Sequence, residues 1–181
     1  MTAPTRPELV ADAAVTVLAR DGLRGLTHRA VDAEAGLPAG STSNCFRSRT
    51  ALLEAVVVRL EELDRAAITA GPPPDLTSAP ALAAYLTGNV RLMTSRRHVR
   101  TTRARLVLLL DETAGPAMEA GHHRFLAMLE AMLAEGGHPA PGPAARAVSD
   151  LLDGALMHAA SVRSRTIDVE ELAGAVERLL A

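Results

Sequence analysis

Several residue types are scarce or missing in this sequence. It has no Lys and no Trp, so all 19 basic residues are Arg, and aromatic residues make up only 2% of its 181 residues. The hydrophobic content of 48% must therefore come mainly from Leu, Val, Ala and Met. Because Ala, Leu and Met favour helices, whereas β-branched and aromatic residues favour strands, this composition predicts an all-α protein.

Cysteine and long apolar runs are scarce as well. A single cysteine, Cys45, excludes an internal disulfide and any structural zinc site made of several thiolates. The longest apolar stretch, 106–110, is too short to span a bilayer, and no apolar run follows Arg6 as a secretory signal would require. We therefore expect a soluble, cytoplasmic protein with no membrane partner.

The pattern of charges and motifs argues against several function classes. The formal net charge is −2, with +1 over residues 1–59 and −3 over the remainder, which is too weak an asymmetry to establish nucleic-acid binding. The neighbouring His122 and His123 lack the spacing of a metal site, so we predict no metal and no cofactor. No nucleophile elbow or glycine-rich phosphate loop is present, and we expect that the protein is not an enzyme.

The first 68 residues predict four helices. An apolar stripe indicates an amphipathic helix over 8–20, after which Gly22 can end it. Thr27 can cap a second helix that runs to about residue 35, where Gly36 supplies a left-handed residue. After a turn over 37–40, residues 41–46 are long enough for a short helix, and Thr50 can cap a longer one to about residue 68.

The rest of the chain predicts five more helices. A proline cluster at 71–75 breaks the pattern, and helices are then expected over about 79–94, 97–113, 115–135 and 142–163. The last helix runs over 169–180, with Asp168 as its cap. We expect two helical domains, one over residues 1–50 and one over residues 51–181.

The third predicted helix has the features of a recognition helix. A helix-turn-helix needs a second helix slim enough to enter the major groove of DNA. Residues 41–44 are small hydroxyl or amide side chains that can hydrogen-bond with base edges and phosphates. From the spacing alone, a polar loop cap remains the alternative interpretation.

A set of residues between positions 26 and 49 has a specific spacing: the Leu26-Thr27 pair, Ala35-Gly36-Leu37, Gly40-Ser41, Phe46 and Arg49. With this spacing, roughly residues 8–60 resemble the N-terminal domain of the TetR family of transcriptional regulators. Small residues stand at Ser43 and Cys45, where the family usually has Tyr or another large residue. The resemblance implies a three-helix DNA-binding domain followed by a helical effector-binding domain.

The resemblance also implies roles for individual residues and for the partners of the chain. Thr27 and Arg49 would touch phosphates, His28 and Arg29 would lie near the groove, and the residues facing bases would be Ala39, Ser41, Thr42, Ser43 and Asn44. Residues 151–154 resemble the start of the dimer-forming penultimate helix of the family. Apolar stripes on the last two helices predict a homodimer, which would bind a palindromic operator in double-stranded DNA.

The C-terminal helices predict a pocket for a small-molecule effector. Apolar stripes with a few polar groups indicate a ligand cavity among the helices at 79–94, 97–113 and 115–135. The expected lining residues are Tyr85, Asn89, Met93, Arg103, Leu106, His122 and Phe125. A filled core is the alternative to a cavity, and a solvated basic face is the alternative to an inward Arg103.

These patterns together predict a ligand-responsive transcriptional regulator, a repressor that a small molecule releases from its operator. The alternative is a TetR-like helical protein that acts mainly through protein–protein contacts. For Cys45, a redox switch is the alternative to a small helix residue.

Overall fold

The computed structural model describes residues 3–109, 111–112, 114–161 and 167–181, which form helices and connections without a strand. Contacts divide the chain into two compact units. Unit 1 comprises Met1–Arg65 and Arg100–Gly121, and unit 2 comprises Ala66–Val99 and His122–Ala181. The all-α prediction is confirmed for the described residues.

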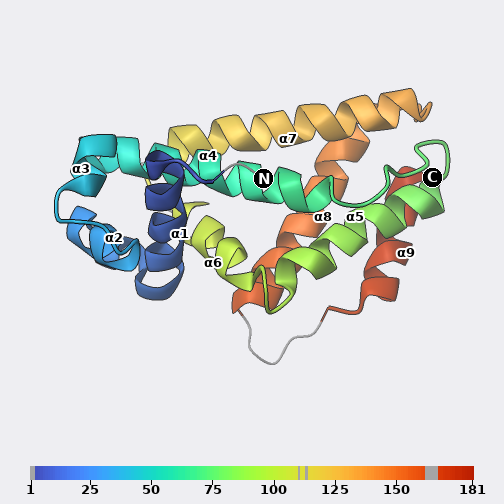
Figure 1. Cartoon of the computed structure of the whole chain (residues 1–181). Coiled ribbons are helices and arrows are strands. Elements are labelled where there is room, and N and C mark those ends of the chain that lie inside the picture. The colour runs from blue at the N-terminus through green and yellow to red at the C-terminus, as the bar shows by residue number, and fades with distance from the viewer. Residues whose placement is uncertain (1–2, 110, 113, 162–166) are drawn as a thin grey trace. The chain divides into compact units, whose positions relative to one another are not determined.

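Figure 1 shows the helices in chain order. Unit 1 holds the N-terminal helices and most of α4 and α6, whose bounds are α1 Arg6–Gly25, α2 His28–Glu34, α3 Ser41–Cys45, α4 Arg49–Ile68 and α6 Val99–Leu109. Unit 2 holds α5 Ala79–Thr94, α8 Pro141–Ser161 and α9 Val169–Leu180. The helix α7, Gly115–Glu135, contributes its first residues to unit 1 and the remainder to unit 2.

Capping residues explain where the N-terminal helices begin. Helix α1 begins before the predicted residue 8, because Thr5 forms a capping box in which its N–H donates to the Glu8 carboxylate at 2.6 Å. Gly22, with a φ of 69°, interrupts α1, but the helix runs on to Gly25, past the end that the sequence predicted. The predicted cap of α4 was wrong: the Ser48 hydroxyl accepts from the Ala51 N–H at 3.0 Å, and Thr50 lies inside the helix.

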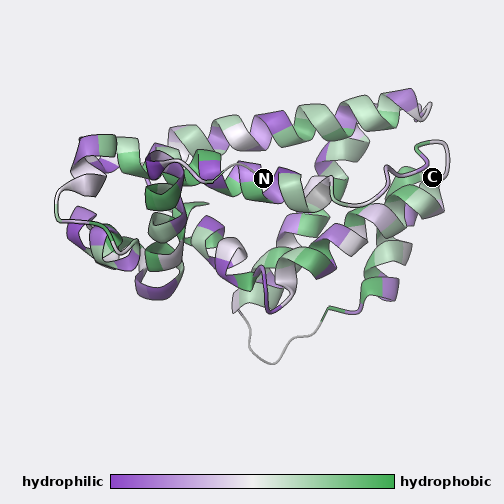
Figure 2. Cartoon of the chain, viewed as in Figure 1, coloured by the Kyte–Doolittle hydropathy of each residue, from purple (hydrophilic) through white to green (hydrophobic). Residues whose placement is uncertain are grey.

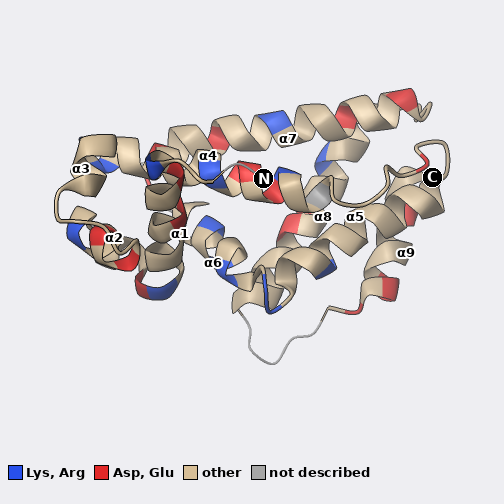
Figure 3. Cartoon of the chain, viewed as in Figure 1, with Lys and Arg blue, Asp and Glu red and all other residues tan. Residues whose placement is uncertain are grey.

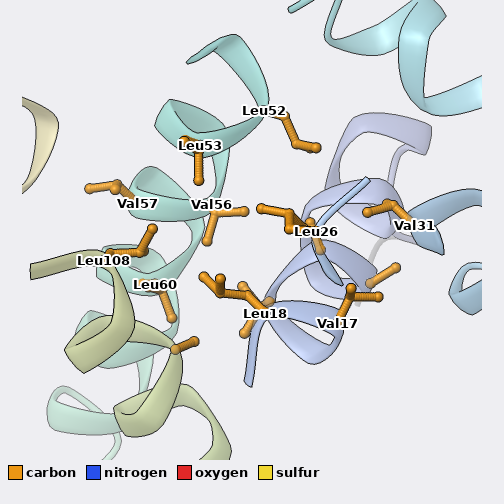
Figure 4. Close-up of a cluster of buried hydrophobic side chains, with 14 of the residues drawn as sticks. Val17, Leu18, Leu26, Val31, Leu52, Leu53, Val56, Val57, Leu60 and Leu108 are labelled. Carbon is orange, nitrogen blue, oxygen red and sulfur yellow. The ribbon is translucent and has the colours of Figure 1, made fainter. Parts of the chain in front are cut away.

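Unit 1 has one hydrophobic core, built almost entirely from Leu, Val and Ala. Figure 4 shows this core between α1, α2, α4 and α6. Its largest fully buried side chains are Leu18, Leu26, Leu52, Leu53, Leu60, Leu108, Val10, Val17, Val31 and Val56. Two ion pairs add to this packing, Arg59 with Asp12 at 2.6 Å and Arg105 with Asp64. The scaffold behind α2 and α3 is therefore a packed aliphatic core, against which the partly buried Phe46 packs.

Unit 2 has a separate core, in which α5 packs against α8 and α9. Figure 2 shows hydrophobic and hydrophilic residues mixed along these helices, as expected for elements with one face buried. The stripes predicted for a dimer interface are partly used within this unit, where Val148, Leu152, Leu172, Val176 and Leu180 are buried. These five residues are therefore covered within one chain and do not need a second copy to bury them.

The predicted bounds of the later helices agree closely with the structure. The bounds of α5, α7 and α9 are those expected, and the Asp168 carboxylate caps α9 by accepting from the Glu170 and Glu171 N–H groups at 3.0 Å. The helix predicted over 97–113 is shorter, since α6 ends at Leu109. The end of the predicted 142–163 helix lies outside the described residues. Among the residues that are described, no helix is both long and apolar enough to cross a membrane.

Candidate functional site

The helices α2 and α3 are joined by a tight turn that begins with Gly36. Its φ of 65° ends α2, and the Leu37 N–H donates to the Asp32 carbonyl at 2.9 Å while the Gly36 N–H donates to the Ala33 carbonyl at 3.3 Å. This pairing is a Schellman motif, and Leu37 completes it by packing against the core of unit 1. The turn fixes the direction in which the chain leaves α2.

A second glycine begins α3. Gly40 has a φ of 91°, a conformation that strains residues with a Cβ, and it forms the N-cap of α3 without any side chain to satisfy the first N–H groups of the helix. The helix has only five residues. Because so short a helix is not stable alone, contacts from outside α3 must hold it.

The buried carboxylate of Asp32 in α2 supplies those contacts. Its oxygens accept from the Gly40 N–H at 2.8 Å, the Thr42 N–H at 2.7 Å and the Thr42 hydroxyl at 2.6 Å. Burial opposes ionisation of this carboxyl group, but the hydrogen bonds from Thr42 and Gly40 outweigh it and hold the pKa of Asp32 below its ordinary value. The resulting stabilisation is present above the ordinary pKa of about 3.9 and is lost as the pH falls through the lower folded value.

The structure corrects the position of two predicted base-contacting residues. Thr42 is fully buried and Ser41 is 5% exposed, whereas both were expected on the outer face of the helix. The Ser41 hydroxyl donates to the Pro38 carbonyl at 2.7 Å, and the Thr42 hydroxyl is bound to Asp32. These hydroxyl groups support the fold of the turn instead of facing outward.

The other predicted residues of this region are on or near the surface. His28 is half-buried, and its Nε2 lies 2.8 Å from the Phe46 carbonyl, to which it must donate. Thr27 caps α2 by accepting from the Ala30 N–H at 3.1 Å. The exposed members of the set are Thr27, Arg29, Ala39, Ser43, Asn44 and Arg49. Arg47 is also exposed but was not among the predicted DNA-contacting residues. Its place directly after Phe46, a residue of the family motif, could have indicated it.

Solved structures of known proteins share the overall fold of this chain. The multidrug binding protein EbrR complexed with malachite green is 24% identical, with a TM-score of 0.78, and the match covers 98% of this chain and 99% of EbrR. A TetR-family member from Streptomyces coelicolor A3 is 25% identical, with a TM-score of 0.75 over 98% of this chain and 99% of its own. No protein-family model and no curated protein matches the sequence.

The chain has the TetR-family fold. A further structure, described as a TetR-family transcriptional regulator from Rhodococcus sp., reaches a TM-score of 0.82 at 22% identity and covers 97% of this chain and 98% of its own. The resemblance inferred from residues 26–49 is thereby confirmed at the level of the fold. Several of the matched structures are described as transcriptional regulators. The individual DNA contacts stay predictions.

Arg49 has a structural role within the TetR-type helix-turn-helix. Its guanidinium group donates to the Leu26 carbonyl at 2.8 Å and to the Leu23 carbonyl at 2.7 Å. These carbonyls lie at the C-terminal end of α1, where a positive charge is favourable. Arg49 therefore ties the start of α4 to the end of α1. Since a guanidinium has five N–H donors, a phosphate contact remains compatible with this role.

The surface charge of this domain is mixed. Figure 3 shows basic and acidic residues interspersed over α1 and α2. Part of this pattern is internal pairing, because Arg20 donates to Asp21 at 2.9 Å and to Glu34 at 2.7 Å. A DNA-binding role must therefore rest on the geometry of α3 and its flanking arginines, as the weak charge asymmetry of the sequence indicated.

The predicted effector-binding residues are divided between the two units. Arg103 and Leu106 belong to unit 1, and the other five belong to unit 2. Arg103 and His122 are exposed, which does not support the inward orientation expected for them, and the half-buried members are Tyr85, Asn89, Met93, Leu106 and Phe125. Tyr85 and Phe125 pack against the core of unit 2. The pocket as a whole stays a prediction.

A hollow of about 160 Å³ in unit 2 contains none of these seven residues. It lies between Leu76, Leu82, Leu133, Gly136 and Leu180. Pockets for drug-sized ligands usually span about 300–1,000 Å³, so this hollow is too small to replace the predicted effector site. Within the part of the chain that is described, no group of three or more metal-ligating side chains was found.

Replacing Arg49 should cost stability, whereas replacing its neighbour should not. We expect Arg49→Ala to lower the free energy of unfolding by about 1 kcal/mol, because it leaves two helix-end carbonyls without their charged donor. The exposed Arg47→Ala is the matched control and should change it by less than about 0.5 kcal/mol. Urea unfolding followed by circular dichroism measures both. Equal effects from the two variants would contradict the structural role of Arg49.

Proposed function

We propose that this protein is a ligand-responsive transcriptional regulator, a repressor that leaves a palindromic operator when a small molecule binds. The observation that carries the proposal is the surface of α3 within a TetR-type fold. Ser43 and Asn44 are exposed on a helix whose start is fixed by Asp32, and Arg29 and Arg47 are exposed on either side of it in the sequence. A slim helix with small polar side chains and flanking arginines suits the major groove.

The two kinds of side chain in this surface would have different tasks on DNA. The amide of Asn44 can donate to and accept from the edge of an adenine, which would discriminate between sequences. Arg29 and Arg47 can neutralise phosphates, which supports binding to any sequence and makes it depend on salt. Substitutions at the two kinds of position should therefore be distinguishable by experiment.

The first test is selection of duplexes from a random-sequence library by the purified protein. We expect enrichment of a palindrome with half-sites about one helical turn apart. Asn44→Ala should lower the preference for the enriched duplex over unrelated DNA, without changing the slope of the log binding constant against log salt concentration. Arg47→Ala should weaken binding to both duplexes and reduce the magnitude of this slope by about 1. If no sequence is enriched, the DNA-binding proposal is wrong, and the alternative of a protein-binding helical module is favoured.

The palindrome depends on a homodimer, which we propose forms through α8 and α9. Besides their buried residues, these helices keep apolar side chains at the surface, with Met157 47% exposed and Leu179 39% exposed. Exposed apolar side chains on two neighbouring helices suit a four-helix interface between two copies of the chain.

Light scattering at micromolar concentration should give twice the mass of one chain. Leu179→Glu should lower the measured mass toward that of the monomer, because dimerisation would bury an unpaired carboxylate in the interface. Met128→Glu on α7 is the control, because Met128 is similarly exposed at 45% but lies outside α8 and α9. A monomeric wild-type protein would contradict the dimer. So would a loss of mass in the control variant alone.

The effector is proposed to be a small, largely apolar molecule. EbrR, which shares the fold, has been crystallised with malachite green and with ethidium. In this chain, Tyr85, Asn89 and Phe125 are half-buried side chains of unit 2 that combine apolar surface with a few polar groups. A ligand can release DNA only if it binds better to a form of the protein that does not fit the operator.

Malachite green is the better probe for this coupling, because ethidium intercalates into DNA by itself. Adding malachite green to the complex with the selected duplex should lower the fluorescence anisotropy of the labelled DNA. Asn89→Ala should shift the midpoint of this release while leaving DNA affinity without dye unchanged, because Asn89 lies outside the helix-turn-helix. A dye that binds the protein tightly and never alters operator affinity would refute the coupling.

A further inference from the structure

The carboxylate of Asp32 acts as an N-cap for a helix to which it does not belong. The usual cap of α3 is missing, because its N-cap residue is Gly40 and has no side-chain hydrogen bond. Asp32 lies in α2, eight residues before Gly40, and accepts the N–H groups of Gly40 and Thr42. Two of the donors that a helix start leaves unsatisfied are thus paired with a side chain from the neighbouring helix.

This cap is unusual in its burial. Asp32 is 5% exposed and Thr42 is fully buried, and the Thr42 hydroxyl adds a third hydrogen bond at 2.6 Å. Burying a carboxylate is unfavourable unless its oxygens are well paired, so the arrangement tolerates few other positions of α3. Three short bonds to one rigid carboxylate therefore define both where α3 begins and how it is turned about its axis.

We propose that Asp32 is a positioning residue for sequence readout, which it controls through α3 without touching DNA. This inference rests on the proposed DNA-binding function. With α3 fixed, Ser43 and Asn44 lie on its exposed side, and the Ser43 hydroxyl donates to the Gly40 carbonyl at 2.9 Å. If the bonds from Asp32 are lost, the five-residue helix loses its alignment and the base-reading side chains lose their register.

The sign of the effect separates this role from simple electrostatics. A carboxylate close to a DNA-binding surface repels phosphates, so electrostatics alone predicts that its neutralisation strengthens binding to every sequence. Positioning predicts weaker binding to the preferred sequence. The amide of Asn cannot accept three hydrogen bonds as the carboxylate does, and its own N–H groups would face the N–H donors of α3. Binding to unrelated DNA depends on phosphate contacts and should change little.

The test compares Asp32→Asn with the wild-type protein on two labelled duplexes, one selected from a random library by the wild-type protein and one unrelated. We expect Asp32→Asn to lose about tenfold or more in affinity for the selected duplex and less than about twofold for the unrelated one. Glu54→Gln is the matched control, since it removes one negative charge at an exposed position of α4 in the same unit. It should bind both duplexes at least as tightly as the wild-type protein.

Two further measurements exclude a general loss of structure. Amide hydrogen exchange of Asp32→Asn should be faster at Gly40 and Thr42 but unchanged in the core of α1 and α4. Thr42→Val keeps the shape of the side chain and removes only the hydroxyl bond, so it should lose discrimination in the same direction by a smaller factor. This variant decides the question if Asp32→Asn does not fold.

The possible outcomes are distinct. A wild-type protein that enriches no duplex overturns the proposed function and this role with it. A wild-type protein that enriches one, with Asp32→Asn binding it as well as Glu54→Gln does, overturns the role of Asp32 alone. Loss of affinity for both duplexes by the same factor would also overturn it, because positioning predicts a loss of discrimination.

Discussion

The buried carboxylate of Asp32 is the interaction on which the arrangement of the helix-turn-helix depends. The five-residue α3 has neither the length nor the cap to be stable by itself, and its N–H groups at Gly40 and Thr42 are satisfied from α2. The left-handed glycines Gly36 and Gly40 bring the two helices into the geometry that these hydrogen bonds require. The exposed face of α3 is thus a consequence of a buried polar contact, supported by the apolar core of α1, α2 and α4.

Much of this fold can be predicted from local sequence. The stripes of Leu, Val and Ala predict the helices, and the bounds of α5, α7 and α9 follow from prolines, glycines and the cap at Asp168. The helix end at Gly36 was predictable for the same reason, whereas Gly22, which was also expected to end a helix, only interrupts α1. The TetR-type motif over residues 26–49 also indicates the correct fold.

The burial of Ser41 and Thr42 could not be predicted in this way. Small hydroxyl residues at the start of a presumed recognition helix suggest an outward face, and nothing in a six-residue window shows otherwise. The partner that makes burial of Thr42 favourable is Asp32, ten residues earlier and on another helix. The cap at Ser48 was missed for a simpler reason, because Ser48 and Thr50 are both plausible caps and only backbone geometry separates them. Periodicity likewise could not show that part of the apolar stripes on α8 and α9 is covered by α5 and by the two helices themselves.

The central claim is that the exposed side of α3 reads bases while its buried side stays bound to Asp32. A crystal structure of the protein on its selected duplex tests this most directly. The account predicts that Asn44 lies at a base edge in the major groove and that the Thr42 hydroxyl remains hydrogen-bonded to Asp32, away from DNA. A complex in which Thr42 has left Asp32 to contact a base, or in which α3 lies outside the groove, would contradict it.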